Sequence, residues 1–553
     1  MNNNSKRFLT NILTGIFVLT LFSFNPNDSE SLEISRNLEI FNTLFKEVNK
    51  LYVEDIDPEQ LIKVGIKSML ESLDPYTSFI PPEKLGNFRS MITGEYNGIG
   101  AEIDQKWNQL VVTMIYDGYP AHKAGLEIGD EIVKVDDASV YGKTKSEIDR
   151  MLKGEENTSV ELEIRRFDHK KLIKKTLKRE KLYINNVKYA GLVRDNVGYI
   201  KLTEFTSGAG NEVRYALEEL KSAGATGIIF DLRDNPGGLL VEAINVANVF
   251  VSKGRLVVKT KGKVNNYNKI YRTLDDPVDT EIPLVVLVNH ESASAAEIVA
   301  GVIQDYDRGI IVGDKTYGKG LVQATRPISH DSHLKITTAK YYMPSGRCIQ
   351  VAQSGSNSPV FKNHSSEDDN SYLTSNGREV NGGHGVEPDI EVEIEKENSI
   401  VRLLNNKGFI FDFATEYFYQ NESICDPENF TISEKDYQEF LKYLKDRDFN
   451  FQTDEEEQLM QFKNLARNDS YYNEIEQEIS SILNKITRNK HQELLLNRKD
   501  IVEALENEII SRYYLEEGLI RNKLQHEQEI GKAIEMLVNM HQYNVVLASI
   551  KEI

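Results

Sequence analysis

The sequence predicts a multidomain α/β protein, and three observations lead to this fold class. The chain has 553 residues, more than a single domain usually holds. Between about residues 197 and 313, short apolar runs typical of buried strands alternate with segments of helical periodicity. A β-rich stretch precedes this region, and a long acidic stretch with helical spacing follows it. We therefore expect separate folding units around an α/β core.

The composition excludes several classes of function. A formal net charge of −20 argues against nucleic acid as a partner, because its backbone is also negatively charged. Cys348 and Cys425 are the only cysteines, so the chain carries no disulfide framework. The histidines form no H-E-x-x-H pattern and the cysteines no C-x-x-C pattern, so we expect no metal site and no cofactor.

Residues 1–30 have the pattern of an export segment. Lys6 and Arg7 form a basic start, and an apolar run follows from about Phe8 to Phe24. This run is short for a spanning helix and typical of a signal peptide. A buried helix is the structural alternative, and an uncleaved anchor is another, because no clear A-x-A site follows. We expect the bulk of the chain to lie outside the cytoplasmic membrane.

Residues 31–92 are expected to be helical. Apolar residues recur here at helical spacing, and Asp57-Pro58-Glu59 predicts the start of a second helix, with proline in its first turn.

Residues 93–180 predict a small β-rich module. Gly98, Ile99, Gly100 and Ala101 precede an alternating strand pattern. A glycine-containing loop can turn consecutive backbone N–H groups toward a carboxylate, and a peptide can add to an open strand edge. These four residues are therefore a candidate site for a peptide C-terminus.

Residues 181–395 predict the core. The apolar strand 227–232 contains Asp231 near its end, and the loop that follows contains Arg233 and then Gly237 and Gly238. Two glycines allow the backbone to approach a ligand closely at the start of a helix. We assign one N–H donor for an oxyanion to Gly237 or Gly238 and the other to Ala295.

Two residues with catalytic chemistry follow the next strand, residues 283–289. Ser294 stands at a strand-to-helix junction, where unpaired backbone N–H groups point outward. Lys319 lies between two glycines after a further strand, and a strand–helix–strand unit returns it to the same sheet end. The alternative interpretation is structural: small residues suit close helix packing, and Lys319 fits a surface position.

The strand–Ser-Ala-Ser-Ala-Ala-Glu–helix, followed by Thr-Tyr-Gly-Lys-Gly-Leu-Val-Gln, closely resembles the C-terminal processing peptidases, or tail-specific proteases. This resemblance implies that Ser294 is the nucleophile, Lys319 the general base and Gln323 the residue that orients the lysine. The D-x-R-x-N-P-G-G pattern also matches, and Asp231, Arg233 and Glu297 are interpreted as positioning residues. The resemblance further implies a crotonase-like (ββα) core with an inserted PDZ domain over residues 93–180.

The implied reaction is peptide cleavage through an acyl-enzyme, in which a lysine acts as base. A lysine does so at neutral pH only if its pKa falls from about 10.4 toward 7, which burial favours. The implied partners are protein substrates bound by their C-termini, and the implied location is the periplasm or cell envelope. Anchoring through the N-terminal segment and homo-oligomerisation stay open.

The end of the chain carries no catalytic pattern. Residues 353–383 are rich in Ser, Asn, Gly and acids, which predicts a flexible loop. Residues 396–553 predict a helical extension that packs, docks substrate or dimerises.

Two rival interpretations remain. A histidine, His290 or His384, could replace the lysine as base, although no G-x-S-x-G elbow is present. Alternatively, the chain is a catalytically inactive PDZ scaffold or ligand-binding protein.

Overall fold

The computed structural model describes residues 26–106, 109–351, 370–393, 398–447, 454–467 and 472–548. The predicted export segment therefore lies outside the described residues up to residue 25. Among the helices that are described, none is both long and apolar enough to cross a membrane. The chain divides into two compact units, residues 1–79 and 80–553, which are described separately.

The first unit contains two helices, α2 (Pro26–Leu51) and α3 (Pro58–Glu71). Asp57 caps α3, because its Oδ1 accepts from the N–H groups of Glu59 and Gln60 at 2.9 and 3.2 Å. Proline follows at the first helical position, where its missing N–H costs nothing. A short strand, β1 (Ser78–Ile80), spans the boundary to the second unit.

The core of the second unit is a six-stranded sheet in the order β10-β11-β12-β15-β16-β21. β10 runs antiparallel to β11, and the remaining neighbours are parallel. The strands are β10 (Val187–Leu192), β11 (Val197–Leu202), β12 (Gly227–Asp231), β15 (Leu284–Val288), β16 (Ile310–Gly313) and β21 (Ile390–Glu391).

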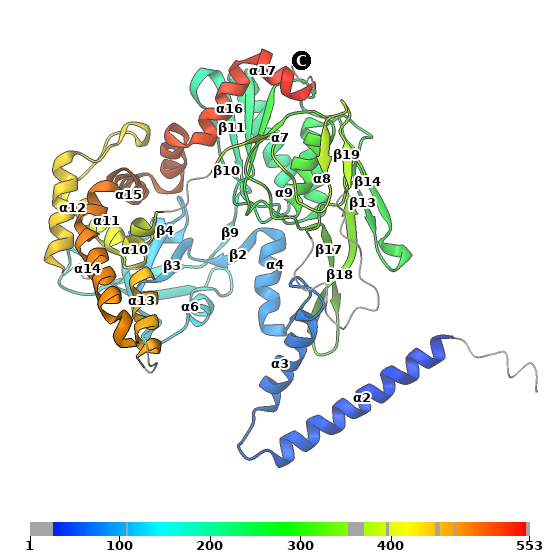
Figure 1. Cartoon of the computed structure of the whole chain (residues 1–553), viewed down its shortest axis with the longest axis horizontal. Coiled ribbons are helices and arrows are strands. Elements are labelled where there is room, and N and C mark those ends of the chain that lie inside the picture. The colour runs from blue at the N-terminus through cyan, green and yellow to red at the C-terminus, as the bar shows by residue number, and fades with distance from the viewer. Residues whose placement is uncertain are drawn as a thin grey trace, which may run out of the picture. The chain divides into compact units, whose positions relative to one another are not determined.

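Helices cover both faces of this sheet. One face packs against α7 (Ala209–Ser222), α8 (Leu240–Phe250) and α9 (Ala295–Asp305). The other face packs against α16 (Gln528–Val538) and α17 (Met540–Leu547), which Figure 1 shows in red beside the sheet. Phe230 lies in the first cluster and its neighbour Ile229 in the second, which explains why β12 is apolar at successive positions. The last helices of the extension are thus a layer of the core.

A second sheet carries the loop that follows β16. It contains the antiparallel strands β17 (Leu321–Pro327), β18 (His333–Tyr342), β13 (Leu256–Lys261) and β14 (Lys269–Arg272). A β-bulge between Val322 and Gln323 interrupts the pairing of β17 with β18. Lys319 lies two residues before β17.

The prediction of a flexible loop over residues 353–383 is wrong for its second half. Residues 352–369 lie outside the described residues, but β19 (Ser371–Leu373) and β20 (Glu379–Asn381) form a hairpin. Buried ion pairs of Arg378 with Asp307 and Asp389 hold the hairpin on the core. The polar composition of this segment did not indicate the hairpin, because its partners lie in the core, outside this segment.

The module before the core is an antiparallel sheet in the order β3-β4-β5-β7-β8, with β6 (Ala138–Ser139) beside β5. The strands are β3 (Ala101–Lys106), β4 (Gln109–Ile115), β5 (Glu131–Val135), β7 (Ser159–Arg165) and β8 (Ile173–Lys178), and the helices are α5 (Pro120–Lys123) and α6 (Lys145–Leu152). β3 and β8 are the edge strands of this order. η1 (Pro82–Lys84) and α4 (Leu85–Thr93) precede the module, and β2 (Glu95–Gly98) pairs with β9 (Glu180–Tyr183) where the chain enters and leaves it.

In its described residues the C-terminal extension consists mainly of helices. It consists of α10 (Ser399–Asn406), α11 (Phe409–Gln420), α12 (Glu434–Asp446), α13 (Asp454–Ala466), α14 (Tyr472–Leu496) and α15 (Arg498–His526), followed by the two helices on the core sheet. α15 is kinked at Leu515, whose φ of 54° and ψ of −149° are not helical. Leu515 and Phe411 pack against the core of the β module, so the extension contacts both neighbouring folds.

Candidate active site

Ser294 occupies a strained turn between β15 and α9. Its φ of 55° and ψ of −109° lie in a region that favours glycine, which costs a non-glycine residue about 1–3 kcal/mol. The turn persists because its neighbours fix it: the Ala293 N–H donates to the carbonyl of Asn235 at 2.9 Å. Ser294 itself is half-buried. The geometry presents this serine at the N-terminus of a helix, where a nucleophile can be reached.

Glu297 joins this turn to the loop that contains Lys319. Its fully buried carboxylate accepts four hydrogen bonds. Oε1 accepts from the Thr316 hydroxyl at 2.6 Å and the Gly318 N–H at 2.7 Å. Oε2 accepts from the Ser294 N–H at 2.8 Å and the Lys319 N–H at 2.9 Å. Burial raises the pKa of Glu297, and these four hydrogen bonds oppose that rise.

Tyr341 is a second bridge between the two residues. Its hydroxyl donates to the carbonyl of Ser294 at 3.2 Å and contacts the carbonyl of Lys319. The tyrosine is 1% exposed, so its position is fixed by packing. Two buried side chains therefore hold the backbones of Ser294 and Lys319 side by side, as the strand–helix–strand topology requires.

Gln323 lies at the β-bulge, four residues beyond Lys319. Its side-chain amide donates to the Leu321 carbonyl at 3.3 Å and to the Thr337 hydroxyl at 3.4 Å. Both contacts are long, so the amide is held only weakly by its own sheet.

The glycine loop lies directly against the serine turn. At Gly237, with φ of 95°, a Cβ would lie 2.6 Å from the Ala293 oxygen and 2.8 Å from the Ala295 nitrogen. The Gly237 N–H donates to Asn235 Oδ1 at 2.8 Å and is therefore engaged. In the described chain, the N–H groups of Gly238 and Ala295 have no hydrogen-bond acceptor.

Asp231 and Arg233 stand behind this loop. Asp231 is fully buried at the end of β12 and accepts from the Tyr199 hydroxyl at 2.7 Å and from the Arg233 guanidinium. Lys201 Nζ lies 3.3 Å from the same carboxylate. Burial alone would raise the pKa of Asp231, but the charges of Arg233 and Lys201 outweigh it and hold this pKa well below its usual range.

The predicted carboxylate-binding loop, Gly98 to Ala101, connects β2 to the edge strand β3. The Ile99 and Gly100 carbonyls accept from within the module, at 2.7 Å from the Ala121 N–H and 3.0 Å from the Tyr116 N–H. Lys145 at the start of α6 forms an ion pair of 3.0 Å with Asp104 on β3, so this helix lies beside the open edge.

Glu297 and Tyr341 thus join the Ser294 turn to the Lys319 loop, and the glycine loop lies against the same turn. Of the two rival bases, His384 is half-buried in the segment whose Val386 N–H donates to the Thr316 hydroxyl, and His290 is exposed. His290 has a side chain that is 68% exposed and lies 3.5 Å from Glu291.

Sequence reasoning missed Tyr341, whose surrounding residues give no catalytic signal because it acts through contacts with distant segments. Asn235 belongs to the matched D-x-R-x-N-P-G-G pattern, but the sequence did not indicate its contacts with Ala293 and Gly237.

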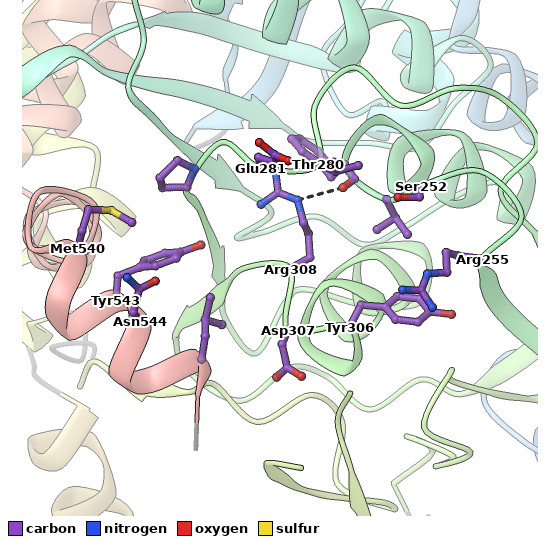
Figure 2. A pocket seen from close by; sticks show the side chains of 14 residues that line it. Ser252, Arg255, Thr280, Glu281, Tyr306, Asp307, Arg308, Met540, Tyr543 and Asn544 are labelled. Carbon is purple, nitrogen blue, oxygen red and sulfur yellow. Dashed lines mark hydrogen bonds between the residues drawn. The ribbon is translucent and has the colours of Figure 1, made fainter. Parts of the chain in front are cut away.

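A cavity of about 370 Å³ lies elsewhere, between α17 and the core. Figure 2 shows Arg308 in it, with a hydrogen bond to the Phe250 carbonyl at 3.0 Å, and Tyr543 and Asn544 of α17. None of the predicted site residues lines this cavity.

Comparison with known proteins identifies three regions. Residues 196–355 match Peptidase family S41, residues 111–166 match the PDZ domain, and residues 400–537 match "Probable PDZ-protease, C-terminal helical domain".

The chain is also similar to individual known proteins. The chain is 37% identical over 319 residues to a carboxy-terminal-processing protease of Bartonella bacilliformis, covering 57% of this chain and 73% of that one. It is 32% identical over 406 residues to a probable CtpA-like serine protease of Staphylococcus aureus, covering 72% and 74%. The solved photosystem II D1 C-terminal processing protease is 29% identical, with 64% and 86% covered and a TM-score of 0.34.

The first two relatives exceed 30% identity over more than two thirds of their length. The predicted core site residues, from Asp231 to Gln323, lie within the match to Peptidase family S41, whereas Gly98 to Ala101 precede the match to the PDZ domain. The chain therefore belongs to the carboxy-terminal-processing proteases of peptidase family S41, as a serine-type peptidase with a PDZ domain and a helical C-terminal domain.

Proposed function

We propose that this protein is an exported endopeptidase that selects protein substrates by their C-terminal tails and cleaves them with a Ser294–Lys319 pair. One observation carries the assignment: Glu297 Oε2 accepts from the backbone N–H groups of both residues. This shared acceptor holds the two backbones close enough for a hydroxyl and an amine to meet. Gln323 orients the amine of Lys319, as the family resemblance implies.

The reaction follows from these roles. Neutral Lys319 takes the proton of Ser294 Oγ as that oxygen attacks the scissile carbonyl. The oxyanion accepts from the N–H groups of Ala295 and Gly238, in preference to Gly237, whose N–H is engaged by Asn235. The tetrahedral intermediate expels the amine, which receives the proton from Lys319. Water, deprotonated by Lys319, then attacks the ester, and Ser294 leaves as the free hydroxyl.

Substrate selection belongs to the PDZ domain in this proposal. The carboxylate of a tail binds the N–H groups of the loop from Gly98 to Ala101, and the tail adds as a strand to the edge of β3 beside α6. Each charge-assisted bond of this kind contributes about 1.5–3 kcal/mol.

The finer architecture and the location are part of the same proposal. We assign the core to the crotonase-like type and residues 31–92 to an N-terminal helical region. Lys6, Arg7 and the apolar run after them support export to the periplasm or cell envelope. Fusing residues 1–40 to a reporter that works only outside the cytoplasm tests this location. A fusion whose reporter works only in the cytoplasm contradicts it.

The catalytic assignment is tested by substitution. Ser294→Ala and Lys319→Ala each abolish cleavage of an unstructured polypeptide, and the double variant loses no more than either, because the two residues act as a unit. Circular dichroism checks that each variant is folded. Full activity of Ser294→Ala would instead favour the inactive-core interpretation, with cleavage due to a contaminant.

A further inference from the structure

The junction between α15 and α16 contacts the loop behind the active site. Glu527 lies between these helices, and its Oε2 accepts from the Arg233 guanidinium at 2.7 Å. Glu529, in the first turn of α16, lies 3.2 Å from the other terminal nitrogen of Arg233. The Arg233 side chain is only 10% exposed, so these ion pairs are shielded from water. The carboxylates come from a part of the chain almost 300 residues away.

Arg233 is the first link of a short chain of contacts that ends at the nucleophile. Two residues along the same loop, the Asn235 carbonyl accepts from the Ala293 N–H at 2.9 Å. The side chain of Asn235 accepts from the Gly237 N–H at 2.8 Å. The loop is thus fixed at one end by Arg233 and at the other by the serine turn, and Gly238 follows immediately.

The charges explain why Arg233 needs these partners. The group contains the cations Arg233 and Lys201 and one buried carboxylate of the core, Asp231; Asp234, which lies 4.0 Å from Lys201, has a side chain that is 70% exposed. Glu527 and Glu529 add shielded negative charge directly beside Arg233. Without them the sheet holds an excess cation in a poorly hydrated place, and the side chain is drawn toward water. Because the Arg233 backbone belongs to the loop, its displacement moves the oxyanion donor.

We propose that Glu527 and Glu529 are positioning residues of the active site, and that the C-terminal helical domain is therefore a working part of the peptidase. They act through Arg233 on the loop that supplies the Gly238 N–H. This inference rests on the proposed role of that N–H in the oxyanion hole.

The test compares two sets of carboxylate variants in the full-length chain. The test variant is Glu527→Gln with Glu529→Gln, which keeps side-chain shape and removes charge. The matched control is Glu428→Gln, because Glu428 pairs with Arg521 of α15 at 2.6 Å but has no contact with the loop. Its side chain is 29% exposed, close to the 24% of Glu527.

Three readouts separate positioning from stability: kcat and KM on a polypeptide substrate, the affinity of a peptide boronate that forms a tetrahedral adduct with Ser294, and the thermal midpoint. We expect the double variant to lose about 10- to 100-fold in kcat and in boronate affinity, as misplaced donors do, with KM within about twofold. The control should match the wild type in kcat, KM and boronate affinity. Unchanged kcat in the folded double variant, or an equal loss in the control, overturns the proposal.

Two further measurements keep the result decisive. If the double variant does not fold, Glu529→Gln alone is compared with the Glu428→Gln control. This single variant keeps the shorter ion pair, which joins Glu527 to Arg233. Ser294→Ala is measured in parallel. If Ser294→Ala is inactive while the glutamine variants are fully active, only the positioning role fails; if Ser294→Ala is active, the proposed catalytic function fails instead.

Discussion

The backbone N–H groups of Ser294 and Lys319 donate to one carboxylate oxygen, Oε2 of Glu297, at 2.8 and 2.9 Å. The nucleophile turn follows β15 and the lysine loop follows β16, and these two strands are parallel neighbours in the core sheet, so topology brings both to the same sheet end. The buried carboxylate of Glu297, with its four donors, then fixes their relative position, and it tolerates neither a lost charge nor a changed shape.

Glu297→Gln should therefore impair both activity and stability. A glutamine has one carbonyl oxygen, and its NH₂ group would face two donors that need an acceptor. We expect kcat to fall by about 100-fold or more through the displaced loop, and the free energy of unfolding to fall by about 1–3 kcal/mol for each unsatisfied donor. Steady-state kinetics and urea denaturation measure the two effects. Glu291→Gln, whose side chain is 62% exposed nearby, is the control and should change neither.

Gly237→Ala should abolish activity through a steric clash. Gly224→Ala serves as the control, because it has similar backbone strain without that clash. A Cβ at Gly237 would lie 2.6 Å from the Ala293 oxygen, whereas a Cβ at Gly224 would meet nothing within 4 Å. Their φ angles, 95° and 94°, are nearly equal, so alanine suffers similar backbone strain at both. We expect Gly224→Ala to lose about 1 kcal/mol of stability and to keep its kcat. Equal kcat values for the two variants would show that the approach of the loop to Ser294 is not needed.

Asp231 should make the protein sensitive to acid. The folded-state pKa of this carboxyl lies below its unfolded value of about 3.9, so its stabilisation is fully present above that pH and is lost as the pH falls below it. The free energy of unfolding should fall with acidification more steeply in the wild type than in Asp231→Asn, by a difference that approaches about 1.4 kcal/mol per pH unit toward pH 3. Denaturation curves between pH 5 and pH 3 measure both slopes, and parallel slopes would contradict the assignment.

Tail recognition should depend on the loop at Gly100. With φ of 77°, this glycine would place a Cβ 2.4 Å from that of Tyr119, so Gly100→Ala distorts the loop. We expect KM for a substrate with a free C-terminus to rise about 10-fold or more, as the loss of one charge-assisted bond does. Gly142→Ala, with φ of 74° and open space, is the control in the same module. Amidating the C-terminus of the substrate should raise the KM of the wild type by a similar factor. In Gly100→Ala, amidation should cause no further rise in KM. A wild-type enzyme indifferent to amidation would exclude carboxylate recognition.

The sequence was sufficient where local pattern and function coincide. The apolar strand, the small-residue turn with Ser294 and the glycine-flanked Lys319 all belong to one strand–helix–strand unit, so their convergence follows from topology. The same residues also indicated the family, because the motif they form extends over more than thirty positions and is therefore specific.

The remaining features depend on contacts between distant segments. Periodicity identifies α16 as an amphipathic helix but cannot say that its apolar face covers Ile229 of the core sheet. In the sequence, the two carboxylates at its start are typical of the acidic residues that favour a helix N-terminus. Only the structure shows that they form ion pairs with Arg233. The hairpin of β19 and β20 was hidden for a similar reason, since Arg378 finds its carboxylates in the core.

The most direct test of the central claim is the rate at which a serine-directed fluorophosphonate labels the protein, with the modified residue identified by mass spectrometry. The Ser294–Lys319 pair predicts labelling of the wild type at Ser294 and labelling of folded Lys319→Ala at least about 100-fold slower, because the general base is gone. His290→Ala should react at the wild-type rate. Modification of another residue, or an unchanged rate in Lys319→Ala, would contradict the pair.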